Sequence, residues 1–148
     1  MISLKQVFDA AFDEAALAAG EGEIPVGAVV FRGEEILSRA HNRREQDRRP
    51  TAHAELLAIE QAAQILGDWR LSDCSLAVTL EPCLMCAGAI INARIKRIYF
   101  AAYDREFGAM GSRYPVFDKR YEIYGGIYEA KASAMLSEFF QQRRKGED

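Results

Sequence analysis

The sequence has no long hydrophobic run, few cysteines and no leader-like N-terminus. Its longest uninterrupted apolar stretches, such as 25–31 and 87–91, fall far short of the ~20 residues that a membrane span needs. The first residues lack the basic start and apolar middle of a secretory signal. The three cysteines are an odd number and two stand in a Cys-x-x-Cys pair, which favours metal or redox chemistry over a disulfide framework. We therefore expect a cytoplasmic protein that does not contact a membrane.

The sequence also has no large excess of positive or negative charge. A formal net charge of -3 and a pI near 5.5 exclude a protein that is coated in positive charge and grips nucleic acid along its whole surface. Any contact with nucleic acid must come from local patches. The hydrophobic content of 49% is too high for a disordered chain, and the length of 148 residues suits one domain. We expect a single domain over 1–148.

The hydrophobic pattern predicts four helices. Ser3 and Gln6 have the spacing of a capping box, which starts a helix that runs to Gly20. A second helix is expected from an N-cap at Thr51 to residue 66. The segment 41–50 before it is almost free of apolar residues and is expected to be an arginine-rich loop. The two remaining helices are predicted at 83–93 and 129–144.

Short apolar and β-branched runs alternate with these helices and predict strands. The runs lie at 24–31, 36–37, 75–80, 98–101 and 121–127. The first two are separated by a turn and predict an antiparallel hairpin, whereas strand, loop, helix and strand over 75–101 have the spacing of a parallel crossover unit. We therefore expect a mixed α/β sheet of about five strands with helices on both faces.

Three side chains of the types that zinc prefers stand at two predicted helix N-termini. His53 begins one helix, and Cys83 and Cys86 begin another, one turn apart. A helix N-terminus favours thiolate, the form that binds metal. Three protein ligands with one open position are typical of catalytic zinc, and Glu55 beside them can carry protons. We expect one zinc per chain.

Two other interpretations of these residues remain open at this point. A structural zinc needs four ligands, and the further candidates are Cys74 and His41, neither of which has the spacing of a zinc knuckle. Cys74 is expected to be a buried, inert side chain. A metal-free redox Cys-x-x-Cys pair would leave the His-Ala-Glu element unexplained.

The order His-x-Glu followed by Pro-Cys-x-x-Cys is the signature of the zinc nucleobase deaminases. Beyond it, the sequence resembles the bacterial tRNA-specific adenosine deaminases in segments that span most of the chain. These segments are 24–29, 41–43, 50–55, 78–90, 108–112 and 137–144. The resemblance implies a cytidine-deaminase-like three-layer α/β/α sandwich, a homodimer, and conversion of adenosine to inosine at the wobble position of a tRNA anticodon stem-loop.

The resemblance also implies roles for single residues. His53, Cys83 and Cys86 would bind zinc, Glu55 would be the general acid and base, and Asn42 would hydrogen-bond the flipped base. An asparagine that only shapes its loop is the alternative for Asn42. The candidates for contact with RNA are Arg43, Arg44, Phe139, Phe140, Arg143 and Arg144. Without the resemblance, the two phenylalanines would be expected in the core.

The sequence departs from the family at three places, all outside the zinc signature. Arg49 replaces an aspartate, Glu106 stands where a lysine-containing stretch is usual, and the segment 113–120 is shorter and lacks an Asn-His pair. The short segment and the acidic pI favour an alternative function, deamination of a free nucleobase, nucleoside or related small ring compound. A third possibility is a non-catalytic, zinc-stabilised module that binds RNA or protein, in which Glu55 would be dispensable.

Overall fold

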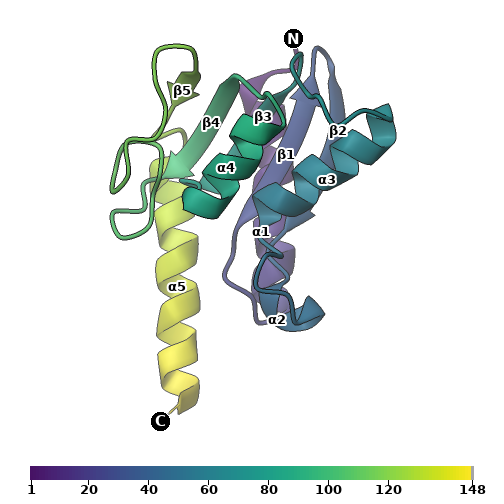
Figure 1. Cartoon of the computed structure of the whole chain (residues 1–148). Coiled ribbons are helices and arrows are strands. Elements are labelled where there is room, and N and C mark those ends of the chain that lie inside the picture. Colours follow the sequence, from purple (N-terminus) through teal and green to yellow (C-terminus); the bar gives the residue numbers. More distant parts are fainter. Residues whose placement is uncertain (148) are drawn as a thin grey trace.

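Short runs of valine, isoleucine and alanine form the central sheet of this computed structural model, and longer amphipathic segments form the helices around it (Figure 1). The structure describes residues 1–147, with side chains to Lys145. Its elements, in chain order, are α1 (Leu4–Gly20), β1 (Gly27–Arg32), β2 (Glu35–His41), α2 (Arg44–Asp47), α3 (Ala54–Leu66), β3 (Ser75–Leu80), α4 (Leu84–Asn92), β4 (Arg97–Ala102), β5 (Glu122–Tyr124) and α5 (Glu129–Glu147).

The five strands form one mixed sheet in the order β2-β1-β3-β4-β5. β1 is antiparallel to both β2 and β3, whereas β3, β4 and β5 run parallel. The crossover through α4 produces the parallel pair β3 and β4, as the spacing of the sequence predicts. The predicted α/β fold class with a mixed five-stranded sheet is confirmed.

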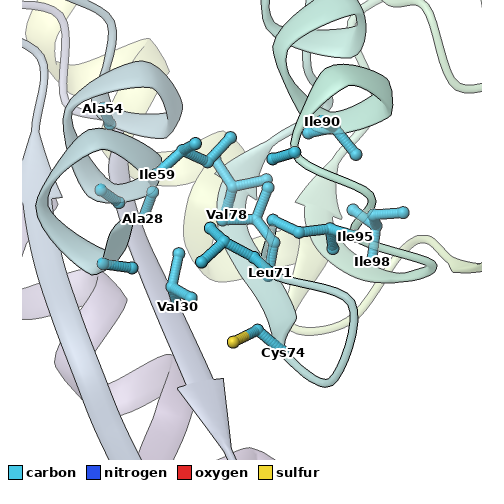
Figure 2. Packing of buried hydrophobic residues seen from close by; sticks show 14 of the residues in the cluster. Ala28, Val30, Ala54, Ile59, Leu71, Cys74, Val78, Ile90, Ile95 and Ile98 are labelled. Atoms are coloured by element: carbon cyan, nitrogen blue, oxygen red, sulfur yellow. The ribbon is translucent and has the colours of Figure 1, made fainter. Parts of the chain in front are cut away.

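Helices cover both faces of the sheet, and the strands alternate their side chains between the two resulting apolar cores. Val30 and Val78 point into the core beneath α3 and α4, together with Ile90 and Ile98 (Figure 2). The neighbouring strand residues face the second core with α1 and the start of α5; they include Val29, Phe31 and Ala77. The first core contains Cys74, which is 3% exposed and is buried as expected.

The N-terminal helix begins at the predicted capping box. The Gln6 backbone N–H donates to Ser3 Oγ at 3.1 Å, and the Gln6 side chain in turn reaches the Ser3 backbone. Within residues 1–147, no helix combines the length and the hydropathy that a bilayer crossing demands.

Two local predictions near the site are wrong. The helix α3 begins at Ala54 with His53 as its N-cap, because residues 49–53 form tight turns in which the Ala52 and His53 N–H groups donate to Arg49 and Thr51. The segment 41–50 is also not entirely loop, since it contains the short helix α2. Farther along the chain, the last strand covers Glu122–Tyr124 and is shorter than the predicted 121–127, and the C-terminal helix extends past its predicted end at residue 144.

Candidate active site

The three predicted metal ligands meet at the N-termini of α3 and α4. His53 and Cys83 are the N-caps of these helices, and Cys86 lies in the first turn of α4. The His53 Nδ1 lies 3.6 Å from the Cys83 Sγ and 3.5 Å from the Cys86 Sγ. In the described part of the chain, these three residues form the one cluster of His, Cys, Asp or Glu ligand atoms with metal-binding spacing.

The distances between these donor atoms fit zinc. A Zn–N bond of ~2.1 Å and a Zn–S bond of ~2.3 Å at a tetrahedral angle place nitrogen and sulfur about 3.6 Å apart. The two nitrogen–sulfur distances in the protein lie within about 0.1 Å of this separation. One imidazole and two sulfurs are also a donor set that suits zinc better than harder cations.

The groups around Cys83 favour its thiolate form, which is the form that binds metal. Hydrogen bonds with the Cys86 side chain and with His53 lower the pKa of the Cys83 thiol to about 4, so it is a thiolate at neutral pH. The pKa of the Cys86 thiol is instead raised, by the neighbouring Cys83 and by burial. A cation at this centre would favour both thiolates, because a coordinating thiol loses its proton.

No fourth protein ligand reaches this cluster among the described residues. Cys74 lies in the core, where burial raises its pKa to about 11. His41 is held between two carboxylates, with Nδ1 2.9 Å from Glu14 and Nε2 3.2 Å from Glu21. The cluster therefore has three ligands, the number that leaves one coordination position for water or substrate and distinguishes catalytic from structural zinc.

Glu55 stands next to the ligand cluster in the first turn of α3 and is 4% exposed. Burial raises the pKa of this carboxyl, so it holds its proton closer to neutral pH than an ordinary glutamate. A carboxyl group with such a pKa is suited to give and take protons during catalysis.

His53, Glu55 and Cys83 line a cavity of about 430 Å³, a size that accommodates a nucleobase with its sugar. Leu80 and Val26 contribute apolar lining. The remaining lining residues are Ile24, Asn42, Arg44, Pro50, Ala54, Glu81, Met85, Asp104 and Phe107.

Asn42 lies in this lining and is 6% exposed. Its Oδ1 accepts a hydrogen bond of 3.2 Å from the Arg44 N–H, and its Nδ2 donates a long one of 3.5 Å to the Ile24 carbonyl. The side chain thus shapes its loop and also faces the cavity. The amide can form up to four hydrogen bonds, so capacity remains for a bound base.

Two buried glutamates that the sequence did not mark as functional hold the loops around the cavity. Glu23 is 1% exposed and accepts hydrogen bonds from the N–H groups of Glu45 (3.1 Å) and Gln46 (2.8 Å), which caps α2 and places Arg44. Glu81 is 2% exposed and accepts from the loop 104–112 on the other side. The one signal in the sequence that could have indicated the burial of these two glutamates is a carboxylate beside apolar strand residues.

The candidates for RNA contact differ in their surroundings. Arg44 lines the cavity, whereas Arg43 forms ion pairs with Glu21 (3.2 Å) and Asp47 (3.1 Å). Phe139 is half-buried and Phe140 is 42% exposed, and neither belongs to an apolar core of the described residues.

The C-terminal half of α5 extends away from the sheet (Figure 1). The Phe139 and Phe140 rings pack edge to face with centroids 5.5 Å apart, and the Arg143 guanidinium lies 5.8 Å from the Phe139 centroid. The exposed Arg144 follows on the same helix. This half of α5 therefore presents aromatic rings and cations together on a protruding surface.

The chain is similar to deaminases over nearly its full length. The model of the MafB19-like deaminase family matches residues 2–144. A tRNA-specific adenosine deaminase of Bacillus subtilis is 43% identical over 140 residues, which cover 91% of this chain and 87% of that protein. A protein of the same name from Aquifex aeolicus is 41% identical and covers 90% of this chain and 91% of its own length.

Solved structures agree with this relationship. One, from a study of A-to-I editing by tRNA:A34 deaminases at the wobble position of transfer RNA, superposes with a TM-score of 0.83 at 36% identity and covers 89% of this chain and 99% of its own. A guanine deaminase from Bacillus subtilis is also 36% identical, with a TM-score of 0.65 over 69% of this chain and 66% of that one.

Proposed function

Because the chain belongs to the MafB19-like deaminase family and to the bacterial tRNA-specific adenosine deaminases, we propose that it deaminates the adenosine at the wobble position of a tRNA anticodon to inosine by hydrolysis. One observation carries this proposal. His53, Cys83 and Glu55 line one cavity of nucleobase size, and Cys86 joins His53 and Cys83 in the ligand cluster, in a chain that matches such enzymes over nine-tenths of its length. We propose that the reaction takes place in the cytoplasm; a tRNA substrate and cysteines suited to metal support this location.

His53, Cys83 and Cys86 would hold one zinc ion per chain, which when bound supplies a Lewis acid that makes water nucleophilic near neutral pH. Glu55 accepts a proton from the attacking water and delivers it to N1 of the adenine ring as the remaining hydroxyl adds to C6. The carboxylate then takes the proton of the new C6 hydroxyl and gives it to the 6-amino group, which leaves as ammonia while the C6 carbonyl of inosine forms. Asn42 hydrogen-bonds the flipped base and holds it against the centre.

The proposal includes a homodimer. Support comes from α4, where Leu84 is 47% exposed and Met85 is 36% exposed, although both are large apolar side chains. Gly88, one turn further along, is also exposed and permits close packing of a second chain. Light scattering at micromolar concentration is expected to give a mass near twice 16.6 kDa, and a mass near one chain would contradict the dimer.

A second candidate is deamination of a free purine base. It is favoured by the similarity to a guanine deaminase and by the short 113–120 segment. It uses the same zinc ligands and proton carrier, so the distinction lies in the substrate and not in the chemistry.

The two candidates are separated by one comparison of substrates. Zinc-loaded protein is incubated with an anticodon stem-loop that carries adenosine at the wobble position, and in parallel with free adenosine, adenine and guanine. We expect inosine in the stem-loop and negligible ammonia from the small molecules. Turnover of guanine with none of the stem-loop, at low salt, would replace the proposed substrate with a free base.

A further inference from the structure

Phe107 is an aromatic residue at the rim of the cavity, and it belongs to neither apolar core of the described residues. Phe107 lines the cavity and yet is 56% exposed. Exposure of so large an apolar ring costs free energy unless a ligand covers it.

Backbone N–H groups of the loop around Phe107 donate hydrogen bonds to Asp104, and these bonds hold Phe107 at the rim. Asp104 Oδ1 accepts hydrogen bonds of 3.1 Å from the N–H groups of Glu106 and Phe107, and the Gly108 N–H donates to the Asp104 carbonyl at 2.8 Å. These contacts close a tight turn around the residue that bears the ring. The exposed ring therefore sits on a backbone that has little freedom to fold it inward.

Glu81, which lies between β3 and α4, fastens this turn to the segment that leads into Cys83 and Cys86. Its Oε1 accepts from the Asp104 N–H at 3.0 Å, and its Oε2 accepts from the Met110 N–H at 2.9 Å and the Ser112 N–H at 3.1 Å. Gly108 permits this contact, because a β-carbon there would lie 2.3 Å from the Glu81 carboxyl carbon. Cys83 follows Glu81 by two residues, so the turn that bears the ring and the start of α4 share one support.

From this arrangement we propose that Phe107 is a substrate-contacting residue, which stacks on the nucleotide adjacent to the adenosine that enters the cavity, and that Glu81 is its positioning residue. The inference rests on the proposed function, since it assumes a single-stranded RNA loop at the rim. A target base that leaves the stack exposes the face of its neighbour, and an aromatic ring at the cavity mouth can cover that face. Stacking of this kind is tolerant of base identity.

The first test compares kinetic constants of Phe107→Ala, Phe107→Leu and Phe107→Tyr on the wobble-adenosine stem-loop. Removal of the ring is expected to raise KM about 5- to 150-fold, the range that stacking of one base represents, with kcat nearly unchanged. Tyr retains the ring and is expected to restore KM, whereas Leu retains only apolar area and is not. The matched control is Trp69→Ala, because Trp69 is 51% exposed but does not line the cavity.

A second test observes the stack without turnover. Stem-loops carry 2-aminopurine on either side of the wobble position, and its fluorescence is recorded during titration with each protein. Quenching at one of the two neighbours by the wild type and by Phe107→Tyr, and its loss in Phe107→Ala, is the expected result. Glu81→Gln is expected to weaken the quenching although the ring is present.

The outcomes distinguish this inference from the proposed function. If the wild type deaminates the stem-loop and Phe107→Ala matches it in KM and quenching, the stacking role is wrong and the function stands. If Phe107→Ala leaves KM unchanged but lowers the mass of the protein in solution, the ring belongs to a contact between chains, which also overturns the inference. A wild type that ignores the stem-loop and acts on free guanine refutes the function itself.

Discussion

Replacement of Glu81 by glutamine tests whether a buried carboxylate fastens the loop beside the site. The carboxylate accepts from two donors at each oxygen: the Asp104 N–H and the Ser112 hydroxyl at Oε1, and the Met110 and Ser112 N–H groups at Oε2. Glutamine offers one acceptor oxygen and one NH₂ donor group. With its NH₂ at the Oε2 position, two backbone N–H groups lose their acceptor.

With its NH₂ at the Oε1 position, the Ser112 hydroxyl can turn to accept and only the Asp104 N–H is left without a partner. We expect glutamine to adopt this second orientation. One buried donor without an acceptor costs about 1–3 kcal/mol, so the free energy of unfolding is expected to fall by about that amount. Urea denaturation of the zinc-loaded protein measures it, with metal content checked before each experiment.

The control removes a carboxylate charge where no buried donor depends on it. Glu122 forms an exposed ion pair with Arg97 at 2.8 Å, and Glu122→Gln is expected to cost less than about 1 kcal/mol. If Glu81→Gln is as stable as the wild type, or no less stable than Glu122→Gln, the loop does not depend on the buried acceptor and the reasoning is refuted.

Three further predictions concern the proposed centre and its substrate. Cys83→Ala is expected to lower zinc content well below one per chain and to lower thermal stability with it, because the ion joins the N-termini of two helices; mass spectrometry of the metal checks this, and full zinc content would exclude Cys83 as a ligand. Glu55→Ala is expected to keep its zinc and fold but lose about 10²–10⁴-fold or more in kcat, whereas near-normal turnover would show that another group moves the protons. Arg143→Ala is expected to weaken stem-loop binding and reduce the slope of log Kd against log salt by about one unit with no effect on kcat; an unchanged slope would remove Arg143 from the RNA surface.

The sequence predicted the parts of the site that depend on local order. His53 and Glu55 are two residues apart, and Cys83 and Cys86 are one helical turn apart, so each pair is visible as a motif. Their convergence follows from the parallel crossover, which places the N-terminus of α4 beside that of α3 at the same edge of the sheet.

The sequence could not predict the supports of the loops, because their partners are far along the chain. The caps of α2 come from Glu23, 22 and 23 residues away, and the acceptor for Met110 and Ser112 comes from Glu81, 29 and 31 residues away. No local propensity marks such contacts, and α2 was accordingly expected to be loop. The start of α3 was misplaced for a related reason, since turns over 49–53 make His53, and not Thr51, the N-cap.

The most direct test of the central claim uses two stem-loops that differ only in the position of a single adenosine. In one it occupies the wobble position, and in the other it occupies the adjacent anticodon position. Sequencing after incubation with zinc-loaded protein reads inosine as guanosine. The account predicts conversion of the wobble adenosine alone, and its loss in Glu55→Ala. Equal conversion at both positions, conversion that persists without Glu55, or no conversion while free guanine is consumed would contradict it.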